Sequence, residues 1–500
     1  MFDFACTKKK IVLFAFDETE YSIERGLYLP LSKLPFPVVH DADSLISKIR
    51  SEKNYDETDF LKTYCPYENE NSTKNIVDFI FFNKTDTLSL FKTQDNKKPN
   101  ILIYGGNLDT NGITKSLLNL LASVDSTKNN YYICYYQNII NKQANEILNN
   151  LPPNINFYPL GSEKPETAFE YKQKQKFSKN RLGVKSYVSR TKQSLKNDIT
   201  RLFTGIRIDA FIHFSGYGSE SLTEFSFLPC KKAVYVHSNM LMEQKTRQNC
   251  RTDVLKYCYR NYDAVCAVTK DLFDSIKKIA GNKVNLYECP NIIDSKSVLL
   301  KSEEEIRLDS YTSLSVPEND FFAALNSGKK KFINIGRFSK EKGQIRLINA
   351  FSKIHSRNPE TLLFIIGGYT YRGYKTLIEN KIKELNLSDS VILVEKVSNP
   401  YAILKKCDYF VFSSFYEGFG IVVAEADILK KPVISTDVCG IHGFMKSHNG
   451  FLVSNSEDGL YYGMEKLLEN EVAVMNVDFA SYDKNAVSCV EKVIDGLLKS

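Results

Sequence analysis

Residues 411–443, VFSSFYEGFGIVVAEADILKKPVISTDVCGIHG, constrain the fold of this chain more than any other segment. The stretch begins with a short apolar run and then places Glu417 and Glu425 eight residues apart, with two glycines after the first carboxylate. Eight residues are slightly more than two helical turns, so a helix that starts near Phe419 would carry Glu425 and leave Glu417 in the preceding loop. A proline and a second apolar run follow, which is the helix and strand order of a parallel α/β sheet.

This loop has the composition of a diphosphate-binding turn. Glycines let a ligand approach the backbone closely, and the unpaired N–H groups at the start of a helix favour an anion. The pattern therefore indicates a nucleotide-sugar pocket beyond the carboxyl ends of the strands. Taken alone, the carboxylate pair also fits a capped helix with a solvent-facing Glu425.

A second motif precedes the first. Residues 335–343 read IGRFSKEKG and supply Arg337 and Lys342. Together the two motifs resemble the donor site of retaining GT-B glycosyltransferases of the GT4 family (glycosyl transferases group 1), which includes glycogen-synthase-like and teichoic-acid-glucosylating enzymes. The resemblance extends over roughly residues 100–500 and implies two Rossmann-like domains that face a cleft.

The resemblance also implies roles for single residues. Glu417 would lie near the transferred sugar and Glu425 near the nucleotide ribose, while Arg337 and Lys342 would clamp the donor diphosphate. His237, which follows the apolar run KAVYV, would approach the donor sugar. Cationic stabilisation of the leaving diphosphate implies transfer without a metal or another cofactor, from a donor that we expect to be UDP-linked. The catalytic candidates are Glu417, His237, Arg337 and Lys342, and the donor-binding candidates are Gly105, Gly106, Gly112, Arg337, Lys342, Gly367, Gly368, Glu417, Gly418, Phe419, Gly420 and Glu425.

Residues 101–124, ILIYGGNLDTNGITKSLLNLLASV, predict a strand, a glycine-bearing loop and an amphipathic helix. Such a loop also occurs in dinucleotide-binding folds, but the G-x-G-x-x-G spacing is missing here. The resemblance implies instead that its amides face the acceptor and the donor phosphates across the cleft. In one place the chain departs from the family, because residues 439–443 read CGIHG where relatives commonly have a G-x-x-E loop. The pyrophosphate contacts of that loop are therefore not carried over.

The first 90 residues have a different character. The run KIVLFAF at residues 10–16 predicts a buried strand, and residues 43–51 predict an amphipathic helix. This part resembles the C-terminal end of CDP-glycerol glycerophosphotransferases, whose D-Y-S-S segment and catalytic histidines are missing here. We expect a truncated α/β remnant that needs a partner to supply glycerophosphotransferase activity, and an unrelated small α/β cap is the alternative. The residues that carry the resemblance are Phe2, Asp3, Phe4, Asp17, Tyr21, Glu24, Arg25, Gly26 and Tyr28.

The expected fold class is therefore α/β, with a GT-B arrangement that follows the remnant. A chain of 500 residues is too long for one ordinary core. The expected domains are the remnant at residues 1–90, a GT-B N-terminal acceptor domain at 91–300, a linker at 301–330, a C-terminal donor domain at 331–480, and a helix at 481–500 that packs back across the hinge.

Positive charge is concentrated at residues 161–201, where eleven Lys or Arg face four Asp or Glu. This local excess of seven equals the net charge of the whole chain. A solvated helical face explains it equally well as recognition of a polyanionic acceptor or of anionic lipid headgroups. Nucleic acid is disfavoured, because few aromatic residues are interleaved and no nucleic-acid-binding module is recognisable. The acceptor-binding candidates are Lys172, Lys174, Lys176 and Lys179.

Composition narrows the class further. With 43% hydrophobic residues and no run of eighteen apolar residues, the sequence is typical of a globular protein. The order of charges at the N-terminus does not fit a signal peptide, so we expect a cytoplasmic protein, with at most peripheral contact at the inner face of the plasma membrane. The eleven cysteines include no C-x2-C pair and the six histidines have no metal-binding spacing, which predicts buried thiols and no metal site.

These observations favour a retaining glycosyltransferase of capsule or teichoic-acid biosynthesis. It would move a sugar from a nucleotide-sugar to a glycerol-phosphate-containing polymer or to its lipid-linked precursor. A catalytically silent subunit that binds or assembles such polymers is one alternative. A nucleotide-sugar 2-epimerase with the same fold is another, although its additional acid and base residues are not identifiable in the sequence.

Overall fold

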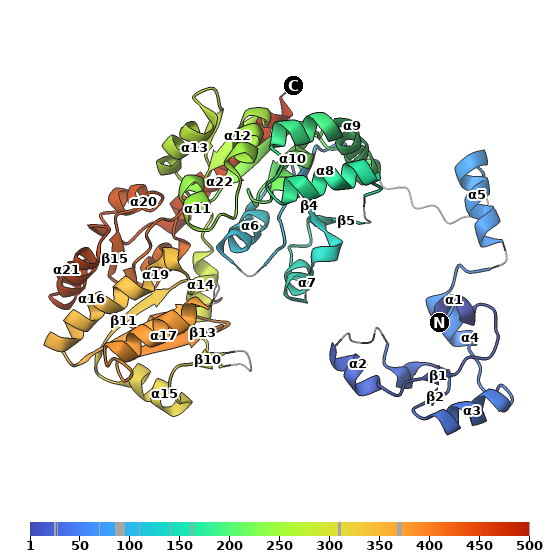
Figure 1. Ribbon diagram of the computed structural model, residues 1–500, viewed down its shortest axis with the longest axis horizontal. Helices are drawn as coiled ribbons and strands as arrows, with labels where there is room; N and C mark the ends of the chain where they lie inside the picture. Colours follow the sequence, from blue (N-terminus) through green and yellow to red (C-terminus); the bar gives the residue numbers. More distant parts are fainter. Residues whose placement is uncertain are drawn as a thin grey trace. The chain divides into compact units, whose positions relative to one another are not determined.

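The computed structural model describes the chain except residues 25, 26, 28, 70, 86–95, 110, 141, 162, 163, 309–311, 368–372 and 500. The chain divides into two compact units, Met1–Asn96 and Lys97–Ser500, which Figure 1 shows.

The first unit is a small α/β unit with a two-stranded parallel sheet. Its core is formed around Ala5, Ile11, Phe36 and Phe60. The elements are α1 (Phe2–Ala5), β1 (Leu13–Phe14), α2 (Glu18–Glu24), η1 (Leu31–Lys33), β2 (Val38–Val39), α3 (Ala42–Arg50), α4 (Thr58–Tyr64) and α5 (Ser72–Phe82).

The prediction of a buried strand at residues 10–16 is wrong. Only Leu13–Phe14 form β1, and the side chains of Phe14 and Phe16 are 44% and 69% exposed. The reason is the short partner strand, because β2 offers two residues for pairing and leaves the rest of the apolar run without a sheet to cover it. Arg25, Gly26 and Tyr28, which carry part of the family resemblance, lie outside the described residues.

The second unit begins with a parallel sheet of order β5-β4-β3-β6-β7-β8-β9. Strands β6 and β8 are buried along their whole length, as expected when helices cover both faces of a parallel sheet. We call this part the N-terminal lobe. Its elements are β3 (Asn100–Tyr104), α6 (Gly112–Ser123), β4 (Asn130–Tyr136), η2 (Gln137–Ile139), α7 (Lys142–Asn149), β5 (Ile155–Leu160), α8 (Ala168–Ser178), α9 (Val184–Phe203), β6 (Ala210–His213), α10 (Ser219–Phe225), β7 (Lys231–Val236), α11 (Met240–Thr246), α12 (Thr252–Asn261), β8 (Ala264–Ala267), η3 (Lys270–Leu272), α13 (Phe273–Ala280) and β9 (Leu286–Glu288).

The C-terminal lobe contains the second sheet, of order β10-β13-β12-β11-β14-β15-β16. All of its neighbouring strands are parallel except β10, which pairs with β13 in the antiparallel direction. The segment expected as a linker at 301–330 contains β10 and α15, and α15 packs on α18. The elements are α14 (Ser295–Ser302), β10 (Ser313–Leu314), α15 (Glu318–Asn326), β11 (Lys330–Ile335), η4 (Lys340–Lys342), α16 (Gln344–Arg357), β12 (Thr361–Gly367), α17 (Tyr374–Glu384), β13 (Val391–Glu395), α18 (Tyr401–Lys406), β14 (Tyr409–Phe412), α19 (Ile421–Ile428), β15 (Val433–Thr436), α20 (His442–Ser447), β16 (Phe451–Val453), α21 (Glu457–Leu468) and α22 (Phe479–Leu498).

In the parallel part of each sheet, successive strands are added first toward one edge and then, from a switch point, toward the other edge. In the N-terminal lobe the reversal lies between β3 and β6, and in the C-terminal lobe between β11 and β14. Open parallel sheets bind ligands beyond the strand ends at these switch points. The loops that follow the four strands, at residues 105–111, 214–218, 336–339 and 413–420, contain most of the donor-binding candidates.

The two lobes are joined by more than the chain that connects them. The last helix, α22, packs against β6, β7 and β9 of the N-terminal lobe, and Figure 1 shows it running among the helices of that lobe. Asp483 on α22 accepts a hydrogen bond of 2.6 Å from the backbone N–H of Ile293. Ser116 on α6 donates to Asn291 at 2.6 Å. The segment that contains Asn291 and Ile293 is therefore held by hydrogen bonds with two helices, α6 and α22.

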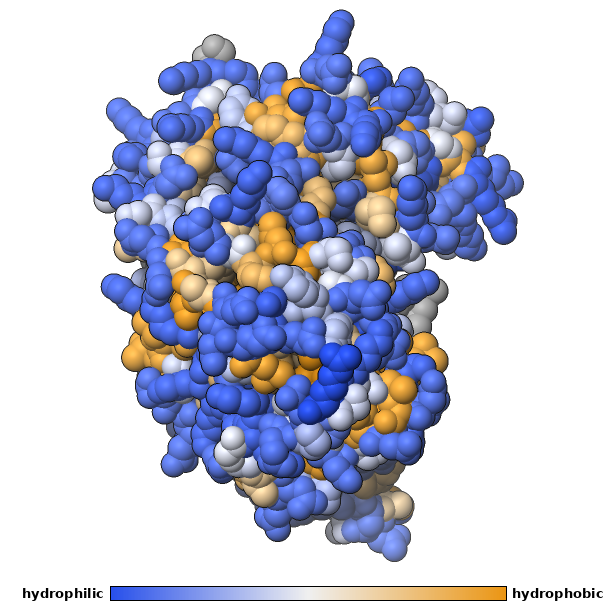
Figure 2. All heavy atoms as spheres, turned by 90° about the vertical axis from the view of Figure 1, so that its left-hand side faces the viewer, coloured by the Kyte–Doolittle hydropathy of each residue, from blue (hydrophilic) through white to orange (hydrophobic). Residues whose placement is uncertain are grey.

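The surface is mainly hydrophilic on the side that faces left in Figure 1. Figure 2 shows that polar and charged side chains cover most of this face and that apolar side chains appear between them in small groups. Among the described residues, no helix has the length and apolar content needed to cross a membrane.

Candidate functional site

Two cations and one carboxylate meet at the switch point of the C-terminal lobe. Lys342, at the end of η4, forms an ion pair with Glu417 in the loop after β14. Arg337, in the loop after β11, lies 3.1 Å from Glu341. Burial alone would raise the pKa of Glu417, but Lys342, the N–H of Gly418 and Arg337 together hold it below its usual range. Glu417 is therefore an ionised carboxylate beside two cations.

The backbone around these side chains leaves little freedom. Gly343 has a φ of +69°, and a Cβ atom there would lie 2.2 Å from the carbonyl oxygen of Ser413. The guanidinium of Arg346 donates to the carbonyl oxygens of Ser413 and Ser414 at 2.7 and 2.8 Å. The backbone that carries Lys342 is therefore held against the end of β14, where the loop with Glu417 begins. This contact fixes the backbone positions of both residues.

Glu425 is buried, which excludes the alternative of a solvent-facing carboxylate. Helix α19 begins at Ile421, so the prediction that Glu425 lies on the helix and Glu417 in the preceding loop is confirmed. The side chain of Glu425 accepts a hydrogen bond of 2.9 Å from Tyr401 and forms an ion pair with Lys115 of the other lobe. The two carboxylates of the motif are thus held by different cations.

The backbones of the two lobes come into close contact at Gly418. A Cβ atom there would lie 1.5 Å from the carbonyl oxygen of His237, which follows β7. The His237 ring donates its Nε2–H to the carbonyl oxygen of Phe214 at 2.6 Å, and burial lowers its pKa to about 4. His237 is therefore a neutral imidazole whose orientation is fixed by Phe214, and its backbone carbonyl oxygen lies against the loop that carries Glu417.

The glycine loop of the N-terminal lobe lines a cavity of about 250 Å³. Gly105 and Gly106 both face it, and Gly106 has a φ of +79°. Gly112 is the first residue of α6, and a Cβ atom there would lie 3.9 Å from Ile421 at the start of α19. The N-termini of two helices, one from each lobe, therefore lie side by side, which favours an anion between the lobes.

Three further donor-binding candidates, Phe419, Gly420 and Gly367, pack closely against neighbouring residues or begin a helix. Phe419 is buried and packs against Phe444, with ring centroids 5.2 Å apart, and Gly420 is the N-cap of α19 with a φ of +71°. Gly367 ends β12, where a Cβ atom would lie 2.5 Å from the ring of Phe338. Gly368 lies outside the described residues.

The loop that departs from the family pattern contacts the N-terminal lobe. The N–H of Gly443 donates to Asp271 at 2.9 Å, and the thiol of Cys439 donates to the carbonyl oxygen of the same residue at 3.1 Å. Gly440 has a φ of +103°, and a Cβ atom there would lie 2.4 Å from the carbonyl oxygens of Glu417 and Gly418. The loop therefore supports the Glu417 turn and takes part in the contact between the lobes.

Sequence reasoning missed the residues that complete the site from the N-terminal lobe. Lys115 lies one turn into α6 and reaches Glu425 and Tyr401. Thr246 and Tyr416 share a hydrogen bond of 2.6 Å across the lobes. The sequence offered little to single out Lys115, because one lysine on an amphipathic helix is ordinary. Its partners, Tyr401 and Glu425, lie about 300 residues away in the sequence.

Pairing between Lys115 and Glu425 is expected to be measurable. Lys115→Met, Glu425→Gln and the double variant should show a coupling of about 1–3 kcal/mol in the free energy of unfolding, because the Glu425 carboxylate is almost fully buried. Denaturant unfolding of the four proteins measures the coupling. Strictly additive effects would show that the two side chains do not interact in solution.

The basic run has two structural parts. Lys174 faces a large cavity of the N-terminal lobe and lies 3.4 Å from Glu166. Lys172 and Lys176 lie on the opposite side of α8 by helical spacing, and Lys179 is its C-cap. The four lysines therefore do not form one surface, although the sequence interpretation grouped them.

Comparisons with known families agree with this geometry. Residues 315–486 match the family described as "Glycosyl transferases group 1", and residues 1–82 match "CDP-Glycerol:Poly(glycerophosphate) glycerophosphotransferase". An uncharacterised glycosyltransferase of Methanocaldococcus jannaschii is 33% identical over 36% of this chain and 41% of its own length. The capsular polysaccharide biosynthesis glycosyltransferase CapM of Staphylococcus aureus is 33% identical over 27% of this chain and 36% of its own length. A poly(glycerol-phosphate) alpha-glucosyltransferase of Bacillus subtilis is 27% identical over 43% of this chain and 28% of its own length.

The matched regions thus span about two fifths or less of these three relatives. Among solved structures, Anabaena HepE in complex with UDP and glucose superposes with a TM-score of 0.56 at 12% identity, covering 80% of this chain and 99% of that protein. A sucrose-phosphate synthase of Thermosynechococcus elongatus has the same TM-score at 16% identity, with coverage of 80% and 99%. The chain therefore has the GT-B fold, and it matches the group 1 glycosyltransferase family at residues 315–486 and the CDP-glycerol glycerophosphotransferase family at residues 1–82.

Proposed function

We propose that the chain is a retaining glycosyltransferase of capsule or teichoic-acid biosynthesis. It transfers a sugar from a nucleotide-sugar, expected to be UDP-linked, to a glycerol-phosphate-containing polymer or to its lipid-linked precursor. The observation that carries the proposal is the meeting of Arg337, Lys342 and Glu417 at the switch point of the C-terminal lobe, in contact with His237 of the other lobe. The names of the staphylococcal and Bacillus relatives support the class of acceptor.

The chemistry follows from these charges. The bond between the sugar C1 and the diphosphate oxygen breaks, and negative charge develops on the leaving diphosphate. Arg337, Lys342 and the N-termini of α6 and α19 stabilise that charge. The acceptor hydroxyl then bonds to C1 on the same face, and its proton passes to the leaving phosphate. Glu417 orients the sugar by accepting hydrogen bonds from the sugar hydroxyls. This scheme requires no metal ion.

A donor screen tests this function. The purified chain is incubated with UDP-, GDP- and CDP-linked sugars, with and without glycerol-phosphate oligomers, and nucleotide release is measured in the presence and absence of EDTA. We expect release to rise with acceptor and to be insensitive to EDTA, and the anomeric configuration of the product by NMR to equal that of the donor. Absence of nucleotide release from every donor would leave the silent subunit as the better interpretation, and free epimerised sugar would favour the 2-epimerase.

Three lysines of the basic run that do not line the cavity have a place in this proposal. Lys172, Lys176 and Lys179 lie on one side of α8 and outside its cavity, where they can contact the phosphodiesters of a polymer. Lys174 differs, because it is paired with Glu166 inside the cavity. The acceptor would therefore contact two regions of this lobe. One is a positively charged outer surface, and the other is an inner cavity in which Lys174 is already paired with a carboxylate.

A further inference from the structure

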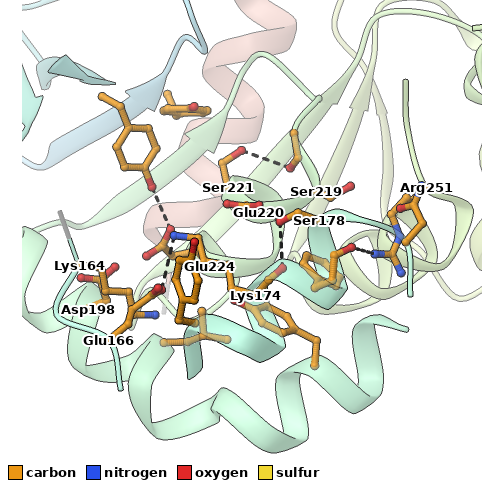
Figure 3. A pocket seen from close by; sticks show the side chains of 18 of the residues that line it. Lys164, Glu166, Lys174, Ser178, Asp198, Ser219, Glu220, Ser221, Glu224 and Arg251 are labelled. Carbon is orange, nitrogen blue, oxygen red and sulfur yellow. Dashed lines mark hydrogen bonds and ion pairs between the residues drawn. The ribbon is translucent and has the colours of Figure 1, made fainter. Parts of the chain in front are cut away.

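A large cavity of the N-terminal lobe has a volume of about 1040 Å³. It is bounded by α8, α9, α10 and residues 248–251, as Figure 3 shows. Cavities of about 300–1,000 Å³ are typical of small-molecule sites, so this one is large enough for one or two sugar units. None of the donor-site residues named above lines it.

The cavity leads to the donor side of the lobe. Tyr104, Gly218 and Ser221 line both this cavity and the smaller one that contains Gly105 and Gly106. Both cavities therefore adjoin the strand ends at the β3–β6 switch point. A molecule bound in the large cavity can direct one end toward the glycine loop.

Three of the four cations that line the cavity are already paired with nearby protein groups. Lys174 pairs with Glu166, and Arg201 lies 2.6 Å from Asp198. Arg251 lies 2.7 Å from Asp253 and also donates to the carbonyl oxygen of Phe177 at 2.7 Å. Three carboxylates of the lining, Glu166, Asp198 and Glu220, and Asp253 beside Arg251 balance the four cations Lys164, Lys174, Arg201 and Arg251, while the remaining carboxyl group, Glu224, is held neutral. A phosphate would meet no excess of positive charge here.

Uncharged hydrogen-bonding groups and rings also line the cavity. Glu224 accepts a hydrogen bond of 2.9 Å from the hydroxyl of Tyr136 and is hydrogen-bonded to Asp198. Burial and the neighbouring Asp198 raise the pKa of Glu224 to about 8, so its carboxyl group is neutral at pH 7. Tyr171 on α8 also lines the cavity and remains 56% exposed. Neutral carboxyl, hydroxyl and ring groups are suited to hydroxyl-rich ligands, which need both hydrogen bonds and an apolar face to pack on.

We propose that this cavity binds a neutral, hydroxyl-rich unit of the acceptor, a sugar or a glycerol residue, with its reacting hydroxyl directed toward the Gly105–Gly106 loop. The proposal rests on the function proposed above and adds a substrate class to it. The charged part of the acceptor remains outside, along Lys172, Lys176 and Lys179.

Ligand binding tests the proposal without any turnover. Saturation-transfer NMR of the full chain is recorded with methyl α-D-glucopyranoside, with glycerol and with inorganic phosphate as separate probes. We expect a signal from the glucoside or from glycerol that phosphate does not displace, and the stronger of the two identifies the unit. Displacement by phosphate, or no signal from either neutral probe, would overturn the proposal.

Variants on α8 locate the binding. Tyr171→Ala should raise the acceptor KM at least about fivefold and weaken the NMR signal, because an aromatic face for packing is lost. Phe169→Ala is the matched control, since Phe169 is 55% exposed on the same helix and does not line the cavity. Equal effects of the two variants, or no effect of Tyr171→Ala, would contradict the assignment.

Glu224 supplies a second, independent variant pair. Glu224→Gln keeps a neutral hydrogen-bonding group and should stay close to the wild-type acceptor KM, while Glu224→Leu should raise it at least about tenfold. Failure of donor hydrolysis in the wild type would refute the proposed function, whereas intact hydrolysis with no difference between Gln and Leu would refute only the role of the cavity.

Discussion

Lys342→Ala is expected to lower kcat/KM for the nucleotide-sugar by about 30- to 1000-fold, which corresponds to about 2–4 kcal/mol of transition-state stabilisation. The effect arises because the ammonium group of Lys342 is fixed beside Glu417, where the diphosphate is expected to leave. Arg337→Ala should produce a loss of the same order. Steady-state kinetics of nucleotide release at varied donor concentration measures both.

Two controls separate this chemical effect from damage to the fold. Lys340 is exposed on the same short helix η4, so Lys340→Ala removes an equal charge without touching Glu417 and should keep near-wild-type kinetics. Lys342→Ala also leaves the Glu417 carboxylate without its main cation. The double variant Lys342→Ala/Glu417→Gln removes that unpaired charge, so a fall in melting temperature that it reverses belongs to the unpaired carboxylate, and a kinetic loss of Lys342→Ala at unchanged melting temperature belongs to catalysis. Wild-type turnover of Lys342→Ala at saturating donor would show that the assigned role is wrong.

The alternation of short apolar runs with amphipathic helices predicted parallel α/β sheets, because this pattern is local. The GT-B arrangement was implied by the resemblance of the two motifs, at residues 335–343 and 411–443, to the donor site of that family. The sequence also predicted the positions of Glu417 and Glu425 relative to the start of α19, since those depend only on helical spacing and on the glycines of the loop. The buried strand at residues 10–16 was predicted wrongly, because burial depends on the length of a partner strand that the local pattern does not reveal.

The partners of these carboxylates could not be predicted. Lys115 meets Glu425 only because two lobes close on each other, and nothing near either residue in the sequence records that contact. The division of the four lysines was missed for a similar reason. The sequence shows a run of positive charge, whereas the structure turns Lys174 toward a cavity and leaves Lys172 and Lys179 exposed. Net charge by itself does not distinguish these two environments.

Gly418→Ala is expected to reduce kcat/KM at least about a hundredfold while the melting temperature changes little, because the substitution acts on the contact between the lobes. The φ of Gly418 lies outside the left-handed region, so alanine can adopt the backbone conformation. Its Cβ would nevertheless lie 1.5 Å from the carbonyl oxygen of His237 and 3.1 Å from the N–H nitrogen of Ser238. These are backbone atoms that cannot rotate away, and Gly440 leaves no room behind the loop, since a Cβ atom there would already lie 2.4 Å from the carbonyl oxygen of Gly418.

The loop that carries Glu417 must therefore withdraw from the N-terminal lobe, and Glu417 moves with it. A shift of about 1 Å in a positioning group can cost about a hundredfold in rate. The substitution lies in a loop and leaves the strands of both sheets paired, so thermal unfolding should report an intact protein. Gly496→Ala on α22, where nothing lies within 4 Å of the added methyl group, is the matched control. Wild-type kinetics of Gly418→Ala would mean that the catalytic form of the enzyme holds its lobes further apart than this structure does, and the assignment of His237 to the site would then lose its geometric support.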